Sequence, residues 1–232
     1  MIDLRLGGWQ IALADVEVDA VICDPPYGQR THGGQTTQSA DGAQRRDLTY
    51  AHMTANDVFA MVASWSPRCR GWMVALTSDD LIPAWRTAYA DAGRLDFAPV
   101  PIIQDRVRMT GDGPASCAVY LMAARPRRKT FLTWGALPGW YRAGTDRDGH
   151  IGGKPLDLMR RIVADYSRAG DLVCDPFAGH GTTLLAARDL ERRAVGAELD
   201  AATWQTAMDR IARSERQYRL FDHALAQDDL PW

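Results

Sequence analysis

The stretch Asp175-Pro176-Phe177-Ala178-Gly179-His180-Gly181-Thr182-Thr183 decides the predicted fold, because it joins the apolar run 172–174 to a helical pattern over 182–190. Glycine in such a turn lets the backbone approach a ligand, and the free amides of a helix start favour a carboxylate or phosphate. The spacing is neither G-x-G-x-x-G nor a P-loop, which ends in Gly-Lys-Ser/Thr. A ligand-binding turn of an α/β fold is therefore predicted, with a plain capped turn as the alternative.

An acid follows at the distance that a nucleotide-binding α/β fold uses. Glu198 ends the next apolar run, 194–197, and lies 23 residues after Asp175. In such folds an acid about 20 residues beyond the glycine turn hydrogen-bonds a ribose. Glu198 is therefore a candidate ribose ligand.

Strand and helix patterns alternate on both sides of a less regular middle. Apolar runs at 20–23, 72–76 and 99–103 predict strands, and apolar residues at helical spacing over 81–89 predict a helix that ends near Gly93. Later helices are predicted from Pro155, which suits a first helical position, and after Asp200, which suits a cap. This alternation predicts a parallel sheet with crossover helices.

A second unusual segment, Asp24-Pro25-Pro26-Tyr27, also follows a predicted strand. The two prolines fix the backbone and remove two amide donors, so their carbonyls can only accept hydrogen bonds. The neighbouring carboxylate accepts as well, and the ring can stack. This set suits a flat group that carries an amino group; a rigid turn with a core tyrosine is the alternative.

Two stretches interrupt the α/β pattern. Residues 28–50 are rich in Gly, Gln, Thr and Arg with little to bury, which predicts a mobile loop beside the site. Residues 106–149 carry a strand-like run at 116–123, the basic run 125–129 and an aromatic stretch, which predicts a small β-rich or irregular insert. A solvated charged turn is the alternative for the basic run.

Composition limits the remaining classes. The 232 residues suit one core with an inserted lobe, and the formal net charge of −2 argues against binding by bulk charge. All of the 27 basic residues except Lys129 and Lys154 are arginine. The four cysteines lie far apart without a C-x-x-C pair, so neither a zinc site nor a disulfide framework is indicated. Apolar runs are too short for membrane helices and the start lacks a signal-peptide pattern, so a cytoplasmic protein is expected.

Together the two segments resemble a known family. D-P-P-Y after one strand and D-P-F-x-G-x-G-T after another look like the S-adenosylmethionine-dependent amino methyltransferases of DNA. Because D-P-P-Y comes first, the order resembles the circularly permuted β group, and Gly153-Lys154-Pro155-Leu156 is similar to its K-P-x-x-L element. The resemblance implies a Rossmann-like α/β methyltransferase sheet, circularly permuted, with a small inserted recognition lobe. Its catalytic half would span residues 1–105, the recognition insert 106–149, and the cofactor-binding half 150–232.

The resemblance also implies roles for individual residues. Asp24 and the Pro25 carbonyl would accept hydrogen bonds from the target amine beside Pro26, and Tyr27 would stack on the base. Aspartate is too weak a base to deprotonate a neutral amine, so positioning and acceptor dipoles would supply the catalysis. S-adenosyl-L-methionine would be bound by Lys154, Pro155, Asp175, Phe177, Ala178, Gly179, Gly181, Thr182, Thr183 and Glu198, with Lys154 and Pro155 closing the methionine end.

A target base inside duplex DNA must be flipped out to be methylated. Phosphate contacts would come from the loop 28–50 and from the basic run of the insert. The predicted DNA-binding residues are Arg30, Arg45, Arg46, Arg125, Arg127, Arg128 and Lys129. Where relatives commonly carry Gly-Asp near the cofactor adenine, this chain has Leu6-Gly7-Gly8-Trp9. The contact is therefore either lost or supplied by the backbone, and stacking by Trp9 is the alternative.

The resemblance implies methyl transfer to N6 of adenine in double-stranded DNA, since Asp at the first position of D-P-P-Y favours adenine. DNA cytosine-N4 methylation, RNA adenine-N6 methylation and a non-catalytic nucleic-acid-binding protein remain alternatives. A protein-glutamine methyltransferase is disfavoured, because that family has N-P-P-Y and the glycine turn first. The resemblance also implies a homodimer and the context of restriction-modification.

Overall fold

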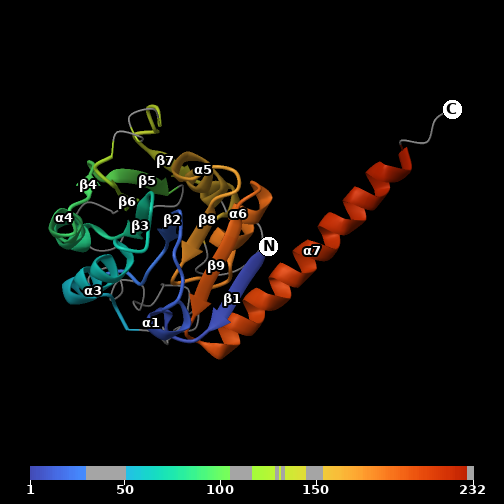
Figure 1. Cartoon of the computed structure of the whole chain (residues 1–232), viewed down its shortest axis with the longest axis horizontal. Helices are drawn as coiled ribbons and strands as arrows, with labels where there is room; N and C mark the ends of the chain where they lie inside the picture. The colour runs from blue at the N-terminus through green and yellow to red at the C-terminus, as the bar shows by residue number, and fades with distance from the viewer. Residues whose placement is uncertain (30–50, 105–116, 129–130, 132–133, 145–153, 229–232) are drawn as a thin grey trace, which may run out of the picture.

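The computed structural model describes residues 1–29, 51–104, 117–128, 131, 134–144 and 154–228, and for 217–228 the backbone alone. Within these residues nine strands form one sheet (Figure 1). The strands are β1 Ile2–Leu6, β2 Ala20–Cys23, β3 Met73–Thr77, β4 Leu95–Asp96, β5 Val100–Gln104, β6 Ala118–Arg125, β7 Tyr141–Ala143, β8 Leu172–Asp175 and β9 Arg193–Glu198.

The strand order is β1-β9-β8-β2-β3-β6-β5-β7, with β4 paired to β6. Strands β1, β9, β8, β2 and β3 pair in parallel, whereas β6 runs antiparallel to both β3 and β5. Parallel neighbours need a crossover between them, so helices must cover both faces of this sheet. The predicted α/β fold is confirmed; the sheet is parallel over these five strands, as predicted, but mixed as a whole because of β6.

The central strands are buried on both faces, and their side chains alternate between two cores. Ala20 and Ile22 of β2 belong to one apolar cluster, and Val21 and Cys23 belong to the other. The first cluster packs under α5 Leu156–Tyr166, α6 Thr182–Asp189 and the start of α7 Ala201–Asp228. The second packs under α1 Trp9–Ala12, α3 Ala55–Trp65 and α4 Ile82–Asp91, the last preceded by the short 3-10 turn η1 Asp79–Leu81. Continuous apolar runs such as 20–23 follow from this two-sided burial.

Local sequence sets several helix boundaries. Thr54 caps α3 in a reciprocal capping box with Asp57. Asp200 caps α7, as predicted, by accepting a hydrogen bond from the Thr203 amide at 2.8 Å. Pro155 is the N-cap of α5 rather than its first helical residue. Helix α7 has 28 residues, and its far end projects away from the sheet (Figure 1).

The predicted insert, 106–149, contains part of the main sheet. Strand β6 pairs with β3 over five residue pairs and with β5 over four, and β7 extends the same sheet. An insert boundary at residue 106 therefore does not mark off a separate lobe in the described residues. The circular permutation and the recognition role of this stretch stay predictions, and most of the loop 28–50 lies outside the described residues.

None of the helices in the described ranges is long and apolar enough to cross a membrane. The four cysteines are free thiols. Three of them, Cys23, Cys69 and Cys174, are buried, and burial raises the pKa of each thiol.

Candidate active site at the carboxyl edge of the sheet

Three acidic side chains follow or end neighbouring parallel strands and so share one edge of the sheet. Asp24 follows β2, Asp175 ends β8 and Glu198 ends β9. Strand β8 lies between β2 and β9, and all three run in the same direction. Ligands of open α/β sheets bind outside the carboxyl ends of the strands, so this edge is the candidate site. Residues 24 and 198 meet here despite their distance in sequence.

The glycine turn between β8 and α6 has a backbone that other residues adopt with difficulty. Gly179 and Gly181 have φ angles of 51° and 77°, in the left-handed region, and Gly181 is the N-cap of α6. The Gly179 amide donates to Glu198 Oε2 at 2.9 Å, and the Ala178 amide donates to the Ala197 carbonyl at 2.9 Å. The turn is therefore fastened to the end of β9, and the first amides of α6 have no hydrogen-bond partner within the helix itself.

Asp175 is a buried acid with a strongly perturbed pKa. Its side chain is 2% exposed, accepts a hydrogen bond from the Phe177 amide at 3.0 Å and is also hydrogen-bonded by Thr183. Burial raises its pKa to about 7; the two hydrogen bonds oppose the shift, and the nearby charges of Asp24 and Glu198 add to it. This site therefore favours a cation that neutralises Asp175.

The side-chain hydroxyls of the two threonines after the glycine turn already have hydrogen-bond partners within the protein. Thr182 Oγ1 accepts a hydrogen bond from Arg210 of α7 at 2.8 Å, and the same guanidinium contacts the His180 carbonyl at 3.1 Å. Thr183 is hydrogen-bonded to Asp175. Both threonines are buried. Their side chains thus brace the turn, which leaves backbone amides as the better candidates for binding a carboxylate; Arg210 was not predicted from the sequence.

The D-P-P-Y segment lies at the same edge, joined to a lysine far along the chain. Lys154 Nζ forms an ion pair with Asp24 Oδ2 at 2.6 Å and lies 4.8 Å from the centre of the Tyr27 ring. Burial disfavours the ammonium, but Asp24 and Tyr27 outweigh it and raise the pKa of Lys154. Burial and the Asp24 charge raise the pKa of Tyr27, so its phenol stays neutral. Lys154 was predicted to close the methionine end of the cofactor; the structure places it on Asp24.

Two residues after β3 support the D-P-P-Y turn and were not predicted. The Gly28 amide donates to Ser78 Oγ at 3.0 Å, and Ser78 Oγ donates to Asp80 Oδ1 at 2.5 Å. A Cβ on Gly28 would overlap the Asp80 carboxylate. Ser78 and Asp80 follow a predicted strand, so the strand-end rule that selected Asp24 also selects them. The Tyr27 carbonyl also accepts a hydrogen bond from the Met53 amide at 3.1 Å.

The remaining residues of the D-P-P-Y segment and of the glycine turn lie beside this edge of the sheet or beneath it. Pro25 is buried and Pro26 is half-buried. Phe177 packs edge-on against Trp9, with ring centroids 6.5 Å apart. Trp9 is itself 8% exposed and also contacts Trp65 in the core. Trp9 therefore serves mainly as a core residue beneath the glycine turn, which argues against the predicted stacking on a cofactor.

The basic run after β6 lies at the opposite edge of the sheet. Strand β6 is antiparallel to β3, so Thr77 pairs with Tyr120 at the site edge and Met73 pairs with Ala124 at the other. Arg125 comes next, and its guanidinium lies 5.6 Å from the ring centres of Phe97 and Phe131. The run therefore lies away from Tyr27, which argues against its predicted part in DNA binding.

The other predicted DNA contacts divide into two groups. Arg127 and Arg128 are exposed and follow Arg125 at that far edge. Arg30, Arg45, Arg46 and Lys129 lie outside the described residues.

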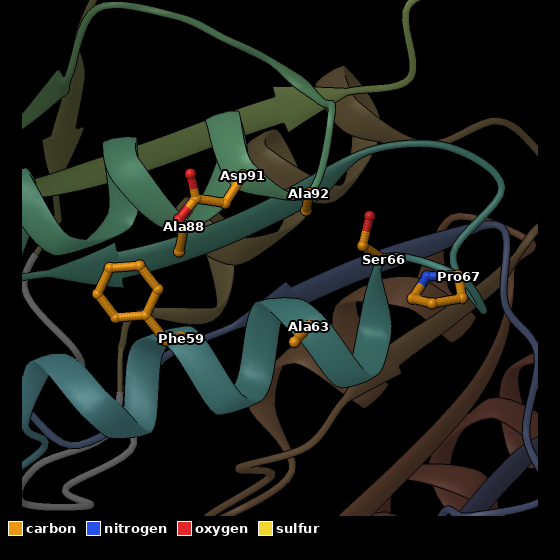
Figure 2. Close-up of a pocket in the computed structure, with 7 residues that line it drawn as sticks. All are labelled: Phe59, Ala63, Ser66, Pro67, Ala88, Asp91 and Ala92. Carbon is orange, nitrogen blue, oxygen red and sulfur yellow. The ribbon is translucent and has the colours of Figure 1, made fainter.

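A shallow groove of about 290 Å³ lies between α3 and α4 (Figure 2). Phe59, Ala88 and Asp91 are among its lining residues, and no residue of the D-P-P-Y segment or of the glycine turn lines it. The groove is thus separate from the candidate active site.

Comparisons with known proteins agree with the motifs. A family model described as DNA methylase matches residues 109–209. Among curated relatives, the type II methyltransferase M.HindIII of Haemophilus influenzae is 39% identical over 66 residues, which are 28% of this chain and 21% of that enzyme. The chain thus spans about a fifth of the length of the first curated relatives that it matches.

Solved structures match over most of the chain. The M1.HpyAVI–SAM complex superposes with a TM-score of 0.66 at 21% identity and covers 90% of this chain and 99% of that one. The cytosine-N4-specific PvuII DNA methyltransferase gives 0.62 at 13% identity, over 89% of this chain and 85% of that one. These matches show a methyltransferase fold. The family model and the curated relatives, each over part of the chain, confirm the resemblance to the S-adenosylmethionine-dependent DNA amino methyltransferases, adenine-N6 and cytosine-N4 enzymes taken together.

Proposed function

We propose that this chain transfers a methyl group from S-adenosyl-L-methionine to an exocyclic amine of a flipped-out DNA base, with N6 of adenine as the target. One observation carries the proposal. Asp24 Oδ1 is buried without a hydrogen-bond partner among the described residues, at the sheet edge that also holds the glycine turn and Glu198. A buried acceptor without a partner is costly unless a ligand supplies the donor.

The residues at this edge fit the proposed cofactor. Asp175 suits the methionyl ammonium, because a cation there offsets the cost of ionising a buried carboxylate. The first amides of α6 suit the methionyl carboxylate. Glu198 accepts backbone hydrogen bonds on both oxygens and still has lone pairs for ribose hydroxyls. When bound, the cofactor supplies an electrophilic methyl group on a sulfonium.

Asp24 would act on the target amine as an acceptor. Its free oxygen would take one amine hydrogen, which turns the nitrogen lone pair away from the ring and towards the methyl group. The nitrogen would then attack the methyl carbon that bound S-adenosyl-L-methionine supplies, with the electrons of the carbon–sulfur bond leaving on sulfur. Asp24 or water would accept the proton that the methylated nitrogen releases. Tyr27, kept neutral by its raised pKa, would stack on the base.

The choice of adenine rests on the aspartate of D-P-P-Y, since serine is commoner there in cytosine-N4 enzymes. The fold itself does not discriminate, because the cytosine-N4-specific PvuII enzyme has a similar one. The test is incorporation of labelled methyl groups into duplex DNA of mixed sequence, single-stranded DNA or RNA, followed by digestion and identification of the nucleoside. N6-methyladenine in DNA is expected. N4-methylcytosine alone would replace the adenine assignment, and no incorporation into any polymer would contradict methyl transfer to nucleic acid.

The position of the basic run gives a separate prediction. Replacing Arg127 and Arg128 together by alanine should leave DNA affinity and its salt dependence unchanged, because both lie at the edge opposite Asp24. Gel-shift titrations at several salt concentrations measure both quantities. A tenfold loss of affinity with a shallower salt slope would instead indicate phosphate contacts and restore the original interpretation.

A further inference from the structure

We propose that Lys154 is a positioning residue that holds Asp24 and Tyr27 in place for the target base, rather than a ligand of the methionine end of the cofactor. This inference rests on the proposed function, because it assigns a role within the same site. It departs from the role that the family resemblance implies for the lysine of the K-P-x-x-L element.

The first argument is that the two carboxylate oxygens of Asp24 have different surroundings. Oδ2 is 2.6 Å from Lys154 Nζ, whereas Oδ1 is buried and has no hydrogen-bond partner in the part of the chain that the structure describes. A carboxylate held at one oxygen by a charged hydrogen bond cannot rotate freely. Lys154 therefore fixes the direction in which Oδ1 presents its lone pairs to an incoming amine.

The second argument is that the same ammonium contacts the aromatic residue of the segment. Nζ lies 4.8 Å from the Tyr27 ring centre, within the range of a cation–π contact. The Lys154 and Asp24 side chains are 18% and 23% exposed, so water screens the pair only in part. One cation thus sets the distance between the amine acceptor and the surface on which the base would stack.

The third argument is electrostatic balance. The Lys154–Asp24 pair is neutral as a unit, which suits a neutral amine as the incoming group. Two further acidic side chains, Asp175 and Glu198, lie at the same edge. The negative charge of Asp24 helps to raise the pKa of Asp175. Removing the Lys154 charge would leave Asp24 as an unpaired, partly buried anion, which is costly.

The test compares Lys154→Met with Lys154→Arg and with Arg70→Met. Arg70 is a control for the loss of a cation, since its replacement also removes ion pairs, to Glu17 at 2.9 Å and to Asp19 at 3.9 Å, but from an exposed side chain. Cofactor affinity is measured by calorimetry and methyl transfer in single turnovers at saturating cofactor. Lys154→Met should lose about 100-fold in transfer rate, the size of effect expected for a misplaced reacting group, with unchanged cofactor affinity. Lys154→Arg should recover part of the transfer rate. Arg70→Met should match the parent protein in both transfer rate and cofactor affinity.

A double-mutant cycle of thermal unfolding tests the contact between Lys154 and Asp24, here called the clamp, without any methyl transfer. Asp24→Asn and Lys154→Met should each lower Tm, and the double variant should lose less than the sum of the two, because neither charge is then left alone. Additive losses, or a fall in cofactor affinity that accounts for the whole loss of rate, would overturn the positioning role. Coupling in the cycle with no methyl transfer by the parent protein would contradict the proposed function and leave the clamp intact.

Discussion

Asp24→Ala should slow methyl transfer by roughly 100- to 1000-fold while the protein still binds S-adenosyl-L-methionine. The substitution removes the buried oxygen Oδ1, which has no other partner in the described residues, and so removes the acceptor for the target amine. Loss of a single preorganised polar contact to reacting atoms costs on the order of 100- to 1000-fold in rate. Single-turnover transfer to DNA and calorimetric cofactor binding measure the two effects separately.

The control for Asp24→Ala is Asp91→Ala, which removes an exposed aspartate beside the groove between α3 and α4. This variant should transfer methyl groups at the parent rate. If Asp24→Ala turned over normally, the assignment of Asp24 as the acceptor would be wrong. If it lost cofactor binding in proportion to rate, Asp24 would belong to the cofactor site instead.

Asp175→Asn should stabilise the ligand-free protein above pH 7 and weaken cofactor binding at the same time. In the folded chain the pKa of Asp175 is about 7, against an ordinary value of 3.8, so the folded state binds this proton more tightly than the unfolded state. The stability that this proton contributes is fully present below pH 3.8 and is lost as pH rises through 7. The shift corresponds to at most about 4 kcal/mol at pH 8, and the neutral amide avoids that cost.

Urea unfolding at pH 5 and pH 8 checks the stability half of this prediction. The parent protein should lose more stability between these values than Asp175→Asn does. Calorimetry checks the binding half: cofactor affinity of the parent should rise between pH 6 and pH 8, as Asp175 ionises, and the variant should bind weakly at both. Equal pH slopes of unfolding in the two proteins would contradict the raised pKa, and undiminished affinity would remove Asp175 from the cofactor site.

Much of the candidate site follows from short stretches of sequence, because its chemistry sits where strands end. The runs 20–23 and 172–174 are apolar enough to be central parallel strands, and the residues that follow such strands must share one edge. Asp24, Asp175, Gly181 and Glu198 could therefore be selected together. The positive φ of the glycines and the cap at Asp200 depend on nearest neighbours in the chain, which sequence also encodes.

Other features depend on pairing between distant segments, which no local pattern encodes. The basic run 125–128 has the composition of a phosphate-binding surface, but the antiparallel direction of β6 carries it to the edge opposite Tyr27. The same strand draws part of the predicted insert into the main sheet. From sequence, the Thr182 hydroxyl is a candidate ligand-binding group. In the structure it accepts a hydrogen bond from Arg210, 28 residues later.

By itself, then, the sequence determined the chemical groups of this protein: an acceptor set at Asp24 to Tyr27, a glycine turn at 175–183 and an acid at Glu198. Only the tertiary structure decided how those groups are partnered, and Lys154 is the clearest case. Its ion pair with Asp24 spans 130 residues and forms because the chain just before α5 lies at the edge where β2 ends. Strand order and direction are properties of the whole sheet, and they set which charges meet.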